Sequence, residues 1–558
     1  MLQSCRARQP FPPFTRSLFH VCRRLSLAAW CQPRSSPGVR LRKRVVCSAG
    51  GHLGRVVGRL CQGTLGDRHV VPGDPGRQPA HPPLPHRLRG AGPDHWQHGD
   101  AIVPLEPPAE PARRSLGSTT NRPLVIDARA AARDNHRVTT ESTRPGDYRQ
   151  RVLDGQLREA LGAAGAVVIE GPRACGKTET ARQAAASEIR MDTPDARQAF
   201  AVDPDFVLAG HTPRLIDEWQ EVPDLWNLVR HEVDDRRAPG QFVLTGSSVP
   251  RDDARRHSGA GRFIRLRMRP MSLMESGHSV GTISLARVLS GERVTAPDPG
   301  LRVGDLAERI VVGGWPGNLG MTPAQASLLN EGYLEDVCRI DVPRVDGVRR
   351  DPSGVRALVT SLARNTACPA SAEGLAADAG VDRAMKVETA RAYLGALDRL
   401  LLTDDVPAWS PSLRSRTRLR ASPVRHLADP SLAAAALGAG PDALLADLNL
   451  LGLLFESLVV RDLRILAGPL RGRIHHYRDA LGLEADAVIE LPGGDWAAFE
   501  IKLGSHPSVV DPAAAGLLRL RDRVAGRPPL ALVVVTGTGY SFTRPDGVLQ
   551  VAIGALAA

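Results

Sequence analysis

The sequence has 558 residues, which is enough for about three or four domains. Its formal net charge of +12 would favour nucleic-acid binding if the charge were evenly spread. Residues 1–137, however, contain 22 basic and 8 acidic residues, which leaves 50 of the 72 basic and 52 of the 60 acidic residues for 138–558. The first part carries +14 and the rest −2, so a global electrostatic argument for nucleic-acid binding fails beyond the first quarter.

Residues 1–137 are also unusual in composition. They are dense in Pro, Gly and Arg, contain five of the eight cysteines and show no sustained apolar period, so we expect no packed core there. We interpret this segment as disordered or as an over-extended gene model whose true start lies near Val138. A mitochondrial transit peptide and a basic arm for nucleic acid are the alternatives.

The sequence gives no sign of a membrane segment or of a cysteine-based site. No stretch approaches the roughly 18 consecutive apolar residues of a membrane-spanning helix. The cysteines beyond residue 137 are Cys175, Cys338 and Cys368, and they have no CxxC spacing, which indicates neither a zinc site nor a disulfide framework. We therefore expect a cytoplasmic protein.

A phosphate-binding loop organises the first predicted domain, residues 138–290. An apolar strand at 166–169 precedes a complete G-x-x-x-x-G-K-[ST] motif, and a good helix-forming sequence follows it, which is the setting that the motif requires. Its glycines let backbone N–H groups turn toward phosphate oxygens. Lys177 is expected to neutralise the β- and γ-phosphates, and the Thr178 hydroxyl to reach Mg²⁺. The predicted nucleotide-binding residues are Gly171, Pro172, Arg173, Ala174, Cys175, Gly176, Lys177, Thr178 and Glu179.

Two acidic residues end the strand predicted at 214–218. Asp217 suits the binding of Mg²⁺ through water opposite Thr178, because carboxylate oxygens are preferred ligands of this ion. Glu218 suits the base that polarises an attacking water. Acidic pairs are usually solvated surface, but a strand end that follows a phosphate loop favours the catalytic interpretation.

Hydroxyl groups end the next buried strand, which begins at Gln241. Thr245 or Ser247 is a candidate sensor of the γ-phosphate, and a strand followed by a Ser-rich turn is the alternative. Arg262 and Arg269 flank a strand at 263–266, and either is a candidate arginine finger. In an arginine-rich chain such residues are more often on the surface.

Lysine is rare in this chain. Of the 72 basic residues, four are lysines and the other 68 are arginines. A lysine in such an arginine-rich chain indicates a position that needs the compact charge of an ammonium group and not the planar guanidinium of arginine. Two of the four, Lys177 and Lys502, lie in the two motifs that look catalytic.

The motifs together resemble a large bacterial and archaeal family of predicted AAA-superfamily ATPases, whose members typically end in a domain of unknown function. The segments that carry the resemblance are Gly171–Thr178, Leu215–Pro223, Leu244–Ser248, Arg269–Leu273, Gly313–Pro316 and Tyr333–Asp336. The resemblance covers nearly all of residues 145–505. It implies an α/β P-loop NTPase fold with a doubly wound parallel sheet, the binding of ATP and its hydrolysis, but it supplies no biological role.

The second predicted domain, residues 291–425, reads as mostly helical. Residues 372–380 and 387–402 resemble a helix–turn–helix, and the pattern shifts at 406–409 as in a winged helix. Such a domain either reads DNA or serves only for packing. The charges of the predicted recognition helix leave both open, because its basic residues are offset by acids: Arg383, Lys386, Arg391 and Arg399 against Glu388 and Asp398.

A second constellation lies in the third predicted domain, residues 426–558. A helix at 450–466 carries Glu456, and predicted strands follow at 474–477, 484–490 and 496–502. Because side chains alternate along a strand, Asp486, Glu500 and Lys502 are expected on one face, where two carboxylates suit Mg²⁺ and a lysine suits developing phosphate charge.

This arrangement resembles the PD-(D/E)xK nuclease core, with Glu456 as the helix acid. A helix at 510–524 and a final strand at 530–536 fit that fold. The sequence departs from the family pattern because no proline precedes Asp486. A hairpin with a cross-strand ion pair between Asp486 and Lys502 is the alternative that requires no chemistry.

The sequence thus predicts an ATPase that uses Mg²⁺ and couples nucleotide turnover to a C-terminal domain for interaction or nucleic acid, with DNA as the candidate partner. The expected catalytic residues are Lys177, Asp217, Glu218 and Thr245, and the expected metal ligands are Thr178 and Asp217. Two other functions stay open: a metal-dependent nuclease that ATP regulates, and a nucleotide-gated interaction module without hydrolysis. An oligomer and an arginine finger between subunits are also left open.

Overall fold

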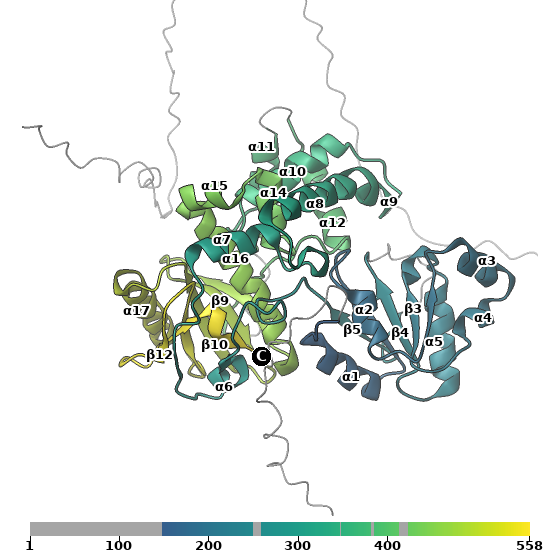
Figure 1. The fold of residues 1–558 in the computed structure, drawn as a ribbon, viewed down its shortest axis with the longest axis horizontal. Helices are drawn as coiled ribbons and strands as arrows, with labels where there is room; N and C mark the ends of the chain where they lie inside the picture. The colour runs from purple at the N-terminus through teal and green to yellow at the C-terminus, as the bar shows by residue number, and fades with distance from the viewer. Residues whose placement is uncertain (1–147, 249–257, 346, 381–383, 412–421) are drawn as a thin grey trace, which may run out of the picture. The chain divides into compact units, whose positions relative to one another are not determined.

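The computed structural model describes residues 148–248, 258–345, 347–380, 384–411 and 422–558. The prediction for residues 1–137 lies outside this part of the chain. The described elements form a five-stranded sheet with its helices, a group of helices, and a seven-stranded sheet with two long helices (Figure 1).

The first sheet is parallel throughout, in the strand order β2-β3-β4-β1-β5. Its strands β1, β3 and β4 are almost entirely buried, as expected for a parallel sheet with both faces covered; β1 and β4 are mostly apolar, whereas β3 has a charged residue at each end. The strands are β1 (Ala166–Glu170), β2 (Ser187–Arg190), β3 (Arg214–Asp217), β4 (Phe242–Gly246) and β5 (Phe263–Arg267). A mixed α/β fold with this parallel sheet is consistent with a P-loop NTPase.

Both faces of this sheet are packed against helices. In β1, Val167 and Ile169 pack in the core that contains Leu157 of helix α1, whereas Ala166 and Val168 pack in the core that contains Val229 of helix α5. The period-two alternation of the strand therefore divides its side chains between two cores. The helices are α1 (Leu153–Ala163), α2 (Lys177–Arg182), α3 (Pro194–Val202), α4 (Pro204–Leu208) and α5 (Leu225–Arg236), with the short helix η1 (Trp219–Glu221) after β3.

The middle of the chain is helical, as predicted. Several of its helices begin at a polar cap whose side chain accepts a backbone N–H, for example Thr322, Asp351 and Ser371. The helices are α6 (Leu285–Leu289), α7 (Val303–Val312), η2 (Pro316–Asn318), α8 (Pro323–Asp336), the π-helical η3 (Val337–Asp341), α9 (Val342–Arg344), α10 (Pro352–Arg364), α11 (Ala372–Ala379), α12 (Val387–Arg399), α14 (Pro430–Leu437) and α15 (Pro441–Ala446).

The second sheet has the strand order β7-β12-β13-β11-β10-β9-β8. Its centre is an antiparallel β9–β10 hairpin followed by helix α17 and the strand β11, which lies parallel to β10. The strands are β7 (Thr295–Ala296), β8 (Arg473–Arg478), β9 (Glu484–Glu490), β10 (Trp496–Lys502), β11 (Leu532–Thr536), β12 (Ser541–Thr543) and β13 (Leu549–Ala552). The helices are α16 (Leu448–Leu466), η4 (Gly468–Leu470), α17 (Pro507–Arg523) and η5 (Ile553–Ala555).

Sheet pairing connects segments that are distant in sequence. The two-residue strand β7 pairs with β12, and β6 (Ile283–Ser284) pairs with β14 (Leu556–Ala557) near the end of the chain. Trp409 lies in the core of the second sheet, with its ring centroid 4.8 Å from that of Trp496. The segment predicted as the start of a wing thus also packs on the C-terminal sheet, through Trp409.

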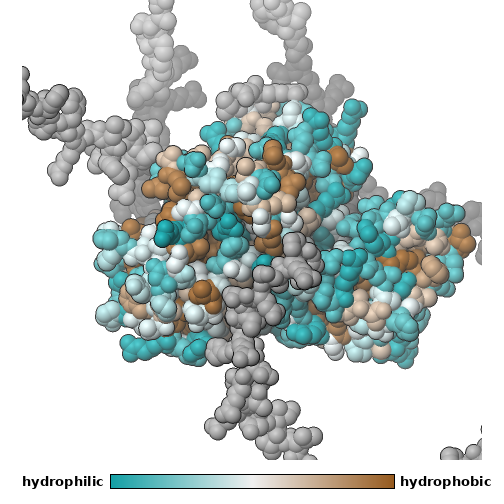
Figure 2. Space-filling view, viewed as in Figure 1, coloured by the Kyte–Doolittle hydropathy of each residue, from teal (hydrophilic) through white to brown (hydrophobic). Residues whose placement is uncertain are grey.

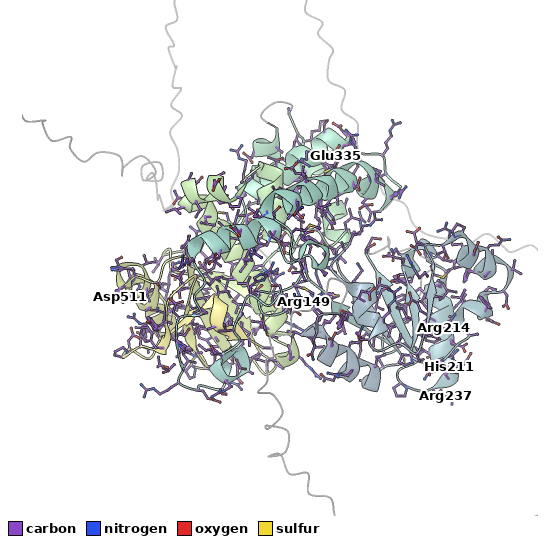
Figure 3. All side chains as sticks on the ribbon, viewed as in Figure 1. Arg149, His211, Arg214, Arg237, Glu335 and Asp511 are labelled. Atoms are coloured by element: carbon purple, nitrogen blue, oxygen red, sulfur yellow. The ribbon has the colours of Figure 1, made fainter. Side chains whose placement is uncertain are left out.

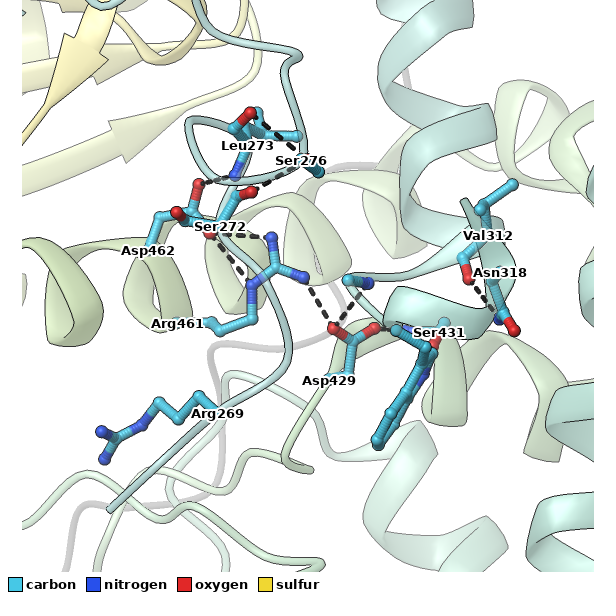
Figure 4. A network of polar contacts seen from close by, with 12 residues as sticks. Arg269, Ser272, Leu273, Ser276, Val312, Asn318, Asp429, Ser431, Arg461 and Asp462 are labelled. Carbon is cyan, nitrogen blue, oxygen red and sulfur yellow. Dashed lines mark hydrogen bonds and ion pairs between the residues drawn. The ribbon is translucent and has the colours of Figure 1, made fainter. Parts of the chain in front are cut away.

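A buried polar network joins the segment after β5 to the C-terminal half (Figure 4). Arg461 donates to Asp429 at 2.6 Å and to Asp462 at 2.9 Å, and Asp462 accepts the backbone N–H of Leu273 at 2.9 Å. A Cβ at Gly314 would lie 2.2 Å from the carbonyl oxygen of Met271, so the backbones approach too closely there for a side chain. The Arg-Pro-Met-Ser-Leu segment is therefore fixed between α16 and the loop after α7.

The face drawn in Figure 2 is mostly hydrophilic, with apolar residues in separate patches. Within the described ranges, we find no helix that combines the length and the apolar character needed to cross a membrane.

Candidate functional site: the phosphate loop and the strand-end acids

The phosphate loop follows β1 directly and leads into α2. Gly176 has a φ of 102°, in the left-handed region that favours glycine. A Cβ at Gly171 would lie 2.4 Å from the carbonyl oxygen of Met268, so the loop passes against the segment after β5. Both glycines of the motif are thus required by the backbone itself.

The ammonium group of Lys177 is buried and is held by its own loop. It donates to the carbonyl oxygen of Pro172 at 2.9 Å. This neutral partner leaves the positive charge of Lys177 unbalanced in the loop. An anionic phosphate is the natural replacement for the carbonyl, because a charge-assisted hydrogen bond is stronger than one to a neutral acceptor.

Asp217 lies at the end of β3, and one of its carboxylate oxygens accepts hydrogen bonds from two hydroxyl groups. Its Oδ1 accepts from Thr178 Oγ1 at 2.8 Å and from Thr245 Oγ1, and its Oδ2 is 3.9 Å from Arg190 Nε. The carboxylate is buried, with 3% of the residue exposed. Since Thr178 donates its proton to Asp217, the lone pairs of the hydroxyl are directed elsewhere, and this oxygen donor set fits Mg²⁺.

Glu218 is the next residue and has the left-handed φ of 55°, which is uncommon for a residue with a side chain. Its carboxylate accepts from Gln220 Nε2 and, at 3.1 Å, from Ser247 Oγ. The turn at Glu218 therefore directs the two adjacent acids to different partners, Asp217 to the loop threonine and Glu218 to Ser247.

The structure brings the predicted nucleotide-site residues together. Thr245 and Ser247, the two candidate sensors, each bind a different acid, so both belong to the same cluster. Glu179 is exposed and pairs with Arg182 at 2.5 Å. Arg173 in the loop pairs with the buried carboxylate of Asp341 in η3, at 2.8 Å.

The two candidate arginine fingers have other partners. Arg262 precedes β5, at the opposite end of the sheet from the phosphate loop, and binds Asp234 at 2.9 Å. Arg269 binds Asp404 at 2.6 Å. Within this chain, therefore, neither guanidinium is directed at the loop. Figure 3 shows Arg214 and Arg237 at the end of the sheet where β3 begins, also away from the loop.

Sequence reasoning missed two residues that support the loop. Arg151 is buried and donates to the carbonyl oxygens of Cys175, at 2.9 Å, and Arg269, at 2.7 Å. Its Nε is 3.1 Å from Glu275. Tyr148 is hydrogen-bonded to Thr180 in α2, at 2.9 Å. Neither residue lies in a contiguous motif, so no local signal identified them.

The C-terminal constellation also assembles on one face of the second sheet. Lys502 Nζ is 2.7 Å from Glu500 and 3.4 Å from Asp486, and Asp486 accepts the backbone N–H of Ile501 at 2.7 Å. Burial, and then the nearby carboxylate of Asp486, raises the pKa of Glu500 to about 8. Burial opposes the charge of Lys502, but Asp486 and Glu500 together raise the pKa of the lysine above its usual value.

Glu456 of α16 lies near this group. Burial, and then the carboxylate of Asp486, raises the pKa of Glu456 well above its usual value. In the ranges that the structure covers, no group of three or more His, Cys, Asp or Glu side chains is arranged to hold a metal ion. The cluster is therefore a lysine with carboxylates that it partly neutralises.

One of the predicted DNA-reading arginines has an acidic partner. Arg391 of α12 pairs with Glu373 of α11. Arg383 lies outside the described residues. The isolated bridges Pro369–Val424, Thr403–Leu427 and Val406–Val424 connect the segments around α11 and α12.

Comparison with known families gives three adjacent matches, each to less than half of the chain. Residues 163–276 match an AAA domain, residues 303–443 a domain of unknown function (DUF8612), and residues 451–555 another domain of unknown function (DUF4143). The AAA match contains the phosphate loop and both strand-end acids.

Similar proteins are found in mycobacteria and archaea. Uncharacterized proteins of Mycobacterium bovis and Mycobacterium tuberculosis are each 28% identical over 400 residues, covering 69% of this chain and 82% of the relative. A Walker-type ATPase of Pyrococcus abyssi is similar at 14% identity and a TM-score of 0.32, over 53% of this chain and 97% of that chain. The AAA match, together with the assembled loop, supports an AAA-superfamily P-loop ATPase domain in this chain.

Proposed function

We propose that the chain binds ATP with Mg²⁺ at residues 171–179 and hydrolyses it with Asp217 and Glu218. The observation that carries the proposal is the shared hydrogen bonding of Asp217 Oδ1, which joins Thr178 in the loop to Thr245 at the end of β4. Three separate segments thereby meet at one carboxylate, next to a lysine whose charge is not balanced by any carboxylate in its own loop.

Each residue then has a role that its contacts suit. Lys177 would exchange the carbonyl of Pro172 for phosphate oxygens, and the Thr178 hydroxyl, oriented by Asp217, would hold the cation. Bound Mg²⁺ would neutralise charge that develops on the transferred phosphate. Glu218 accepts a proton from, or orients, the attacking water, while Ser247 and Gln220 fix its carboxylate. The left-handed backbone at Glu218 suits a functional position, where strain of this kind is often found.

Phosphate release by the full chain with Mg-ATP tests this proposal. We expect Lys177→Ala to remove turnover. The control is Lys386→Ala, which changes a different lysine, at the start of α12, and should retain turnover. ATP turnover that survives Lys177→Ala, or that is absent from the wild type, would exclude ATP hydrolysis at this site. Binding of ATP without turnover in the wild type would favour a nucleotide-gated interaction module.

A second candidate function is metal-dependent cleavage of nucleic acid by the C-terminal domain. It is favoured by the convergence of Asp486, Glu500 and Lys502 beside Glu456, in a helix–hairpin–helix–strand order like that of PD-(D/E)xK nucleases. Two carboxylate oxygens suit Mg²⁺, but Lys502 already neutralises part of their charge, which equally suits a structural ion pair. Mg²⁺-dependent DNA cleavage that is lost in Asp486→Ala would support the nuclease, and absence of cleavage in the wild type would favour the ion pair.

We also propose that α10, α11 and α12 with the bridged segments form a winged helix, and that the domains divide near residues 290 and 425. The order of three helices with bridges at 369, 403–406 and 424–427 supports this fold. The pairing of Arg391 with Glu373 favours packing over DNA reading. DNA binding that is unaffected by Lys386→Ala and Arg391→Ala together would argue against a reading role for α12.

A further inference from the structure

A basic pocket lies beside β5, an edge strand of the first sheet. Its volume is about 270 Å³, and its walls come from α1, β5 and the end of α16 with the turn that follows. Six arginines line it, against the single acid Glu275. We call it the arginine pocket; its arginines are Arg151, Arg265, Arg267, Arg269, Arg464 and Arg471.

The arginines of the pocket differ in how much of each side chain is exposed to solvent. The side chains of Arg471 and Arg265 are 73% and 42% exposed, whereas those of Arg269 and Arg464 are 17% and 8% exposed. The pocket thus has an exposed basic rim and a buried basic floor. Such an arrangement attracts an anion at the rim and holds it where water competes less.

The charges within the pocket are not balanced. Arg151 is paired with Glu275, Arg265 with Glu170, and Arg471 with Glu159. Arg267, Arg269 and Arg464, however, share a single carboxylate, that of Asp404. Three guanidinium groups around one carboxylate leave an excess of two positive charges, and buried charge is costly unless it is paired.

Arg267 retains donors for a ligand. In the part of the chain that the structure describes, its contacts with Thr403 O, at 2.8 Å, and Asp404, at 3.5 Å, both use Nη2. The side chain is 32% exposed, and Nε and Nη1 remain to donate into the pocket. These two groups point to opposite sides of the guanidinium, so each offers a separate charged N–H donor to a phosphate oxygen.

The pocket is separate from the phosphate loop but connected to it. None of its lining residues belongs to 171–178. Arg151, on its wall, donates both to the loop carbonyl of Cys175 and to the backbone of Arg269. Gln156 and Gly468 also line it, and a Cβ at Gly468 would lie 2.6 Å from Gln156 Nε2, so α1 and η4 approach each other there.

We propose that the arginine pocket binds a phosphate group of a ligand other than the nucleotide at the phosphate loop. The excess of two positive charges and the free donors of Arg267 supply the recognition. The phosphate belongs either to a small phosphorylated molecule or to the end of a nucleic-acid strand, since both present the same oxyanion.

Calorimetric titration of the full chain tests this proposal, in a Lys177→Ala background that disables the phosphate loop. The probes are inorganic pyrophosphate and a single-stranded oligonucleotide with and without a 5′-phosphate. We expect saturable binding that Arg267→Gln weakens by about tenfold or more, because hydrogen bonds to a charged group are lost. Arg521→Gln, which removes an arginine of α17 outside the pocket, should leave affinity within about twofold of its parent.

The probes distinguish the two sources of phosphate. Binding of pyrophosphate alone assigns the pocket to a small ligand, and a preference for the 5′-phosphorylated oligonucleotide over its unphosphorylated twin assigns it to a strand end. Equal effects of Arg267→Gln and Arg521→Gln, or no saturable binding of any probe, would overturn the proposal. If Arg267→Gln does not fold, Arg471→Gln at the exposed rim serves in its place, with a smaller expected loss. Because the phosphate loop is disabled throughout, failure here leaves the ATPase proposal intact.

Discussion

Lys177, at the start of α2, and Lys502, at the end of β10, both lie near carboxylates, but their ammonium groups have different partners. Lys177 binds the neutral carbonyl of Pro172, while the nearby Asp217 is occupied by two hydroxyl groups. Lys502 binds Glu500 and Asp486 directly. The first site keeps its positive charge for an incoming anion. At the second site, Lys502 and the two carboxylates already balance part of each other's charge. A metal cation would therefore have to compete for these carboxylates with the lysine and with the proton on Glu500.

The largest expected effect separates the two lysines. Lys177→Ala should slow ATP turnover by about 100-fold or more, because it removes a charged donor from the transition state. Lys502→Ala should leave ATP turnover within about twofold of the wild type. Phosphate release measured at saturating Mg-ATP checks both. A similar loss in the two variants would break the comparison, because it would make the C-terminal cluster part of ATP turnover.

Thr245→Val sharpens the description of the first site. The substitution keeps the shape of a buried side chain but removes a hydrogen bond to Asp217, so we expect turnover to fall by about tenfold. The matched control is Thr536→Val, which changes another buried threonine, at the end of β11, and should leave turnover unchanged. Turnover in Thr245→Val equal to that of the control would contradict the role of the Asp217 cluster.

The pH dependence of stability sharpens the description of the second site. The folded state raises the pKa of Glu500 from 4.5 to about 8, so the folded chain binds a proton that the unfolded chain releases in this range. The stabilisation is fully present below pH 4.5 and is lost as the pH rises toward 8, by up to about 1.4 kcal/mol per pH unit.

Glu500→Gln should flatten this dependence and stabilise the chain at pH 8.5 relative to the wild type. Urea unfolding at pH 5.5 and pH 8.5 measures it, with the exposed Glu484→Gln as control. The contrary outcome is a wild type whose stability rises between these pH values, with the same slope in Glu500→Gln. It would mean that Glu500 ionises at its usual pKa and that no bound proton reduces the charge of the second site.

The smallest effect concerns the contact between the phosphate loop and η3. Arg173→Ala removes the partner of Asp341, but Arg173 is 49% exposed, so solvent already screens the pair. We expect the free energy of unfolding to fall by less than about 1 kcal/mol, measured by urea unfolding at pH 7. A loss of about 3 kcal/mol or more, typical of a broken buried pair, would show that the loop depends on η3 for its conformation.

The first site was largely predictable because its parts are contiguous or lie at strand ends. Gly171 to Thr178 form one motif. Asp217 ends a buried strand and Glu218 follows it, which fixes their place at the edge of a parallel sheet. Which acid each of Thr245 and Ser247 binds was not predictable. It depends on the turn at Glu218, which directs the two acids to different hydroxyl groups.

The arginine pocket was hidden from sequence reasoning. Arg267, Asp404 and Arg464 are far apart in the sequence, and among 68 arginines no single one is distinctive. The short strands β6 and β7 were missed for a related reason, because each has two residues and forms only through pairing with strands near the end of the chain. Local periodicity cannot report contacts that tertiary packing alone creates.

Glu218→Gln tests the central claim most directly, that the first site hydrolyses the ATP it binds. The amide keeps the size of the side chain and the acceptor for Ser247, but it cannot take a proton from water. In a single-turnover experiment with Mg-ATP, we predict that the variant binds nucleotide within about twofold of wild-type affinity and cleaves it at least about 100-fold more slowly. Cleavage by Glu218→Gln at the wild-type rate would contradict the account.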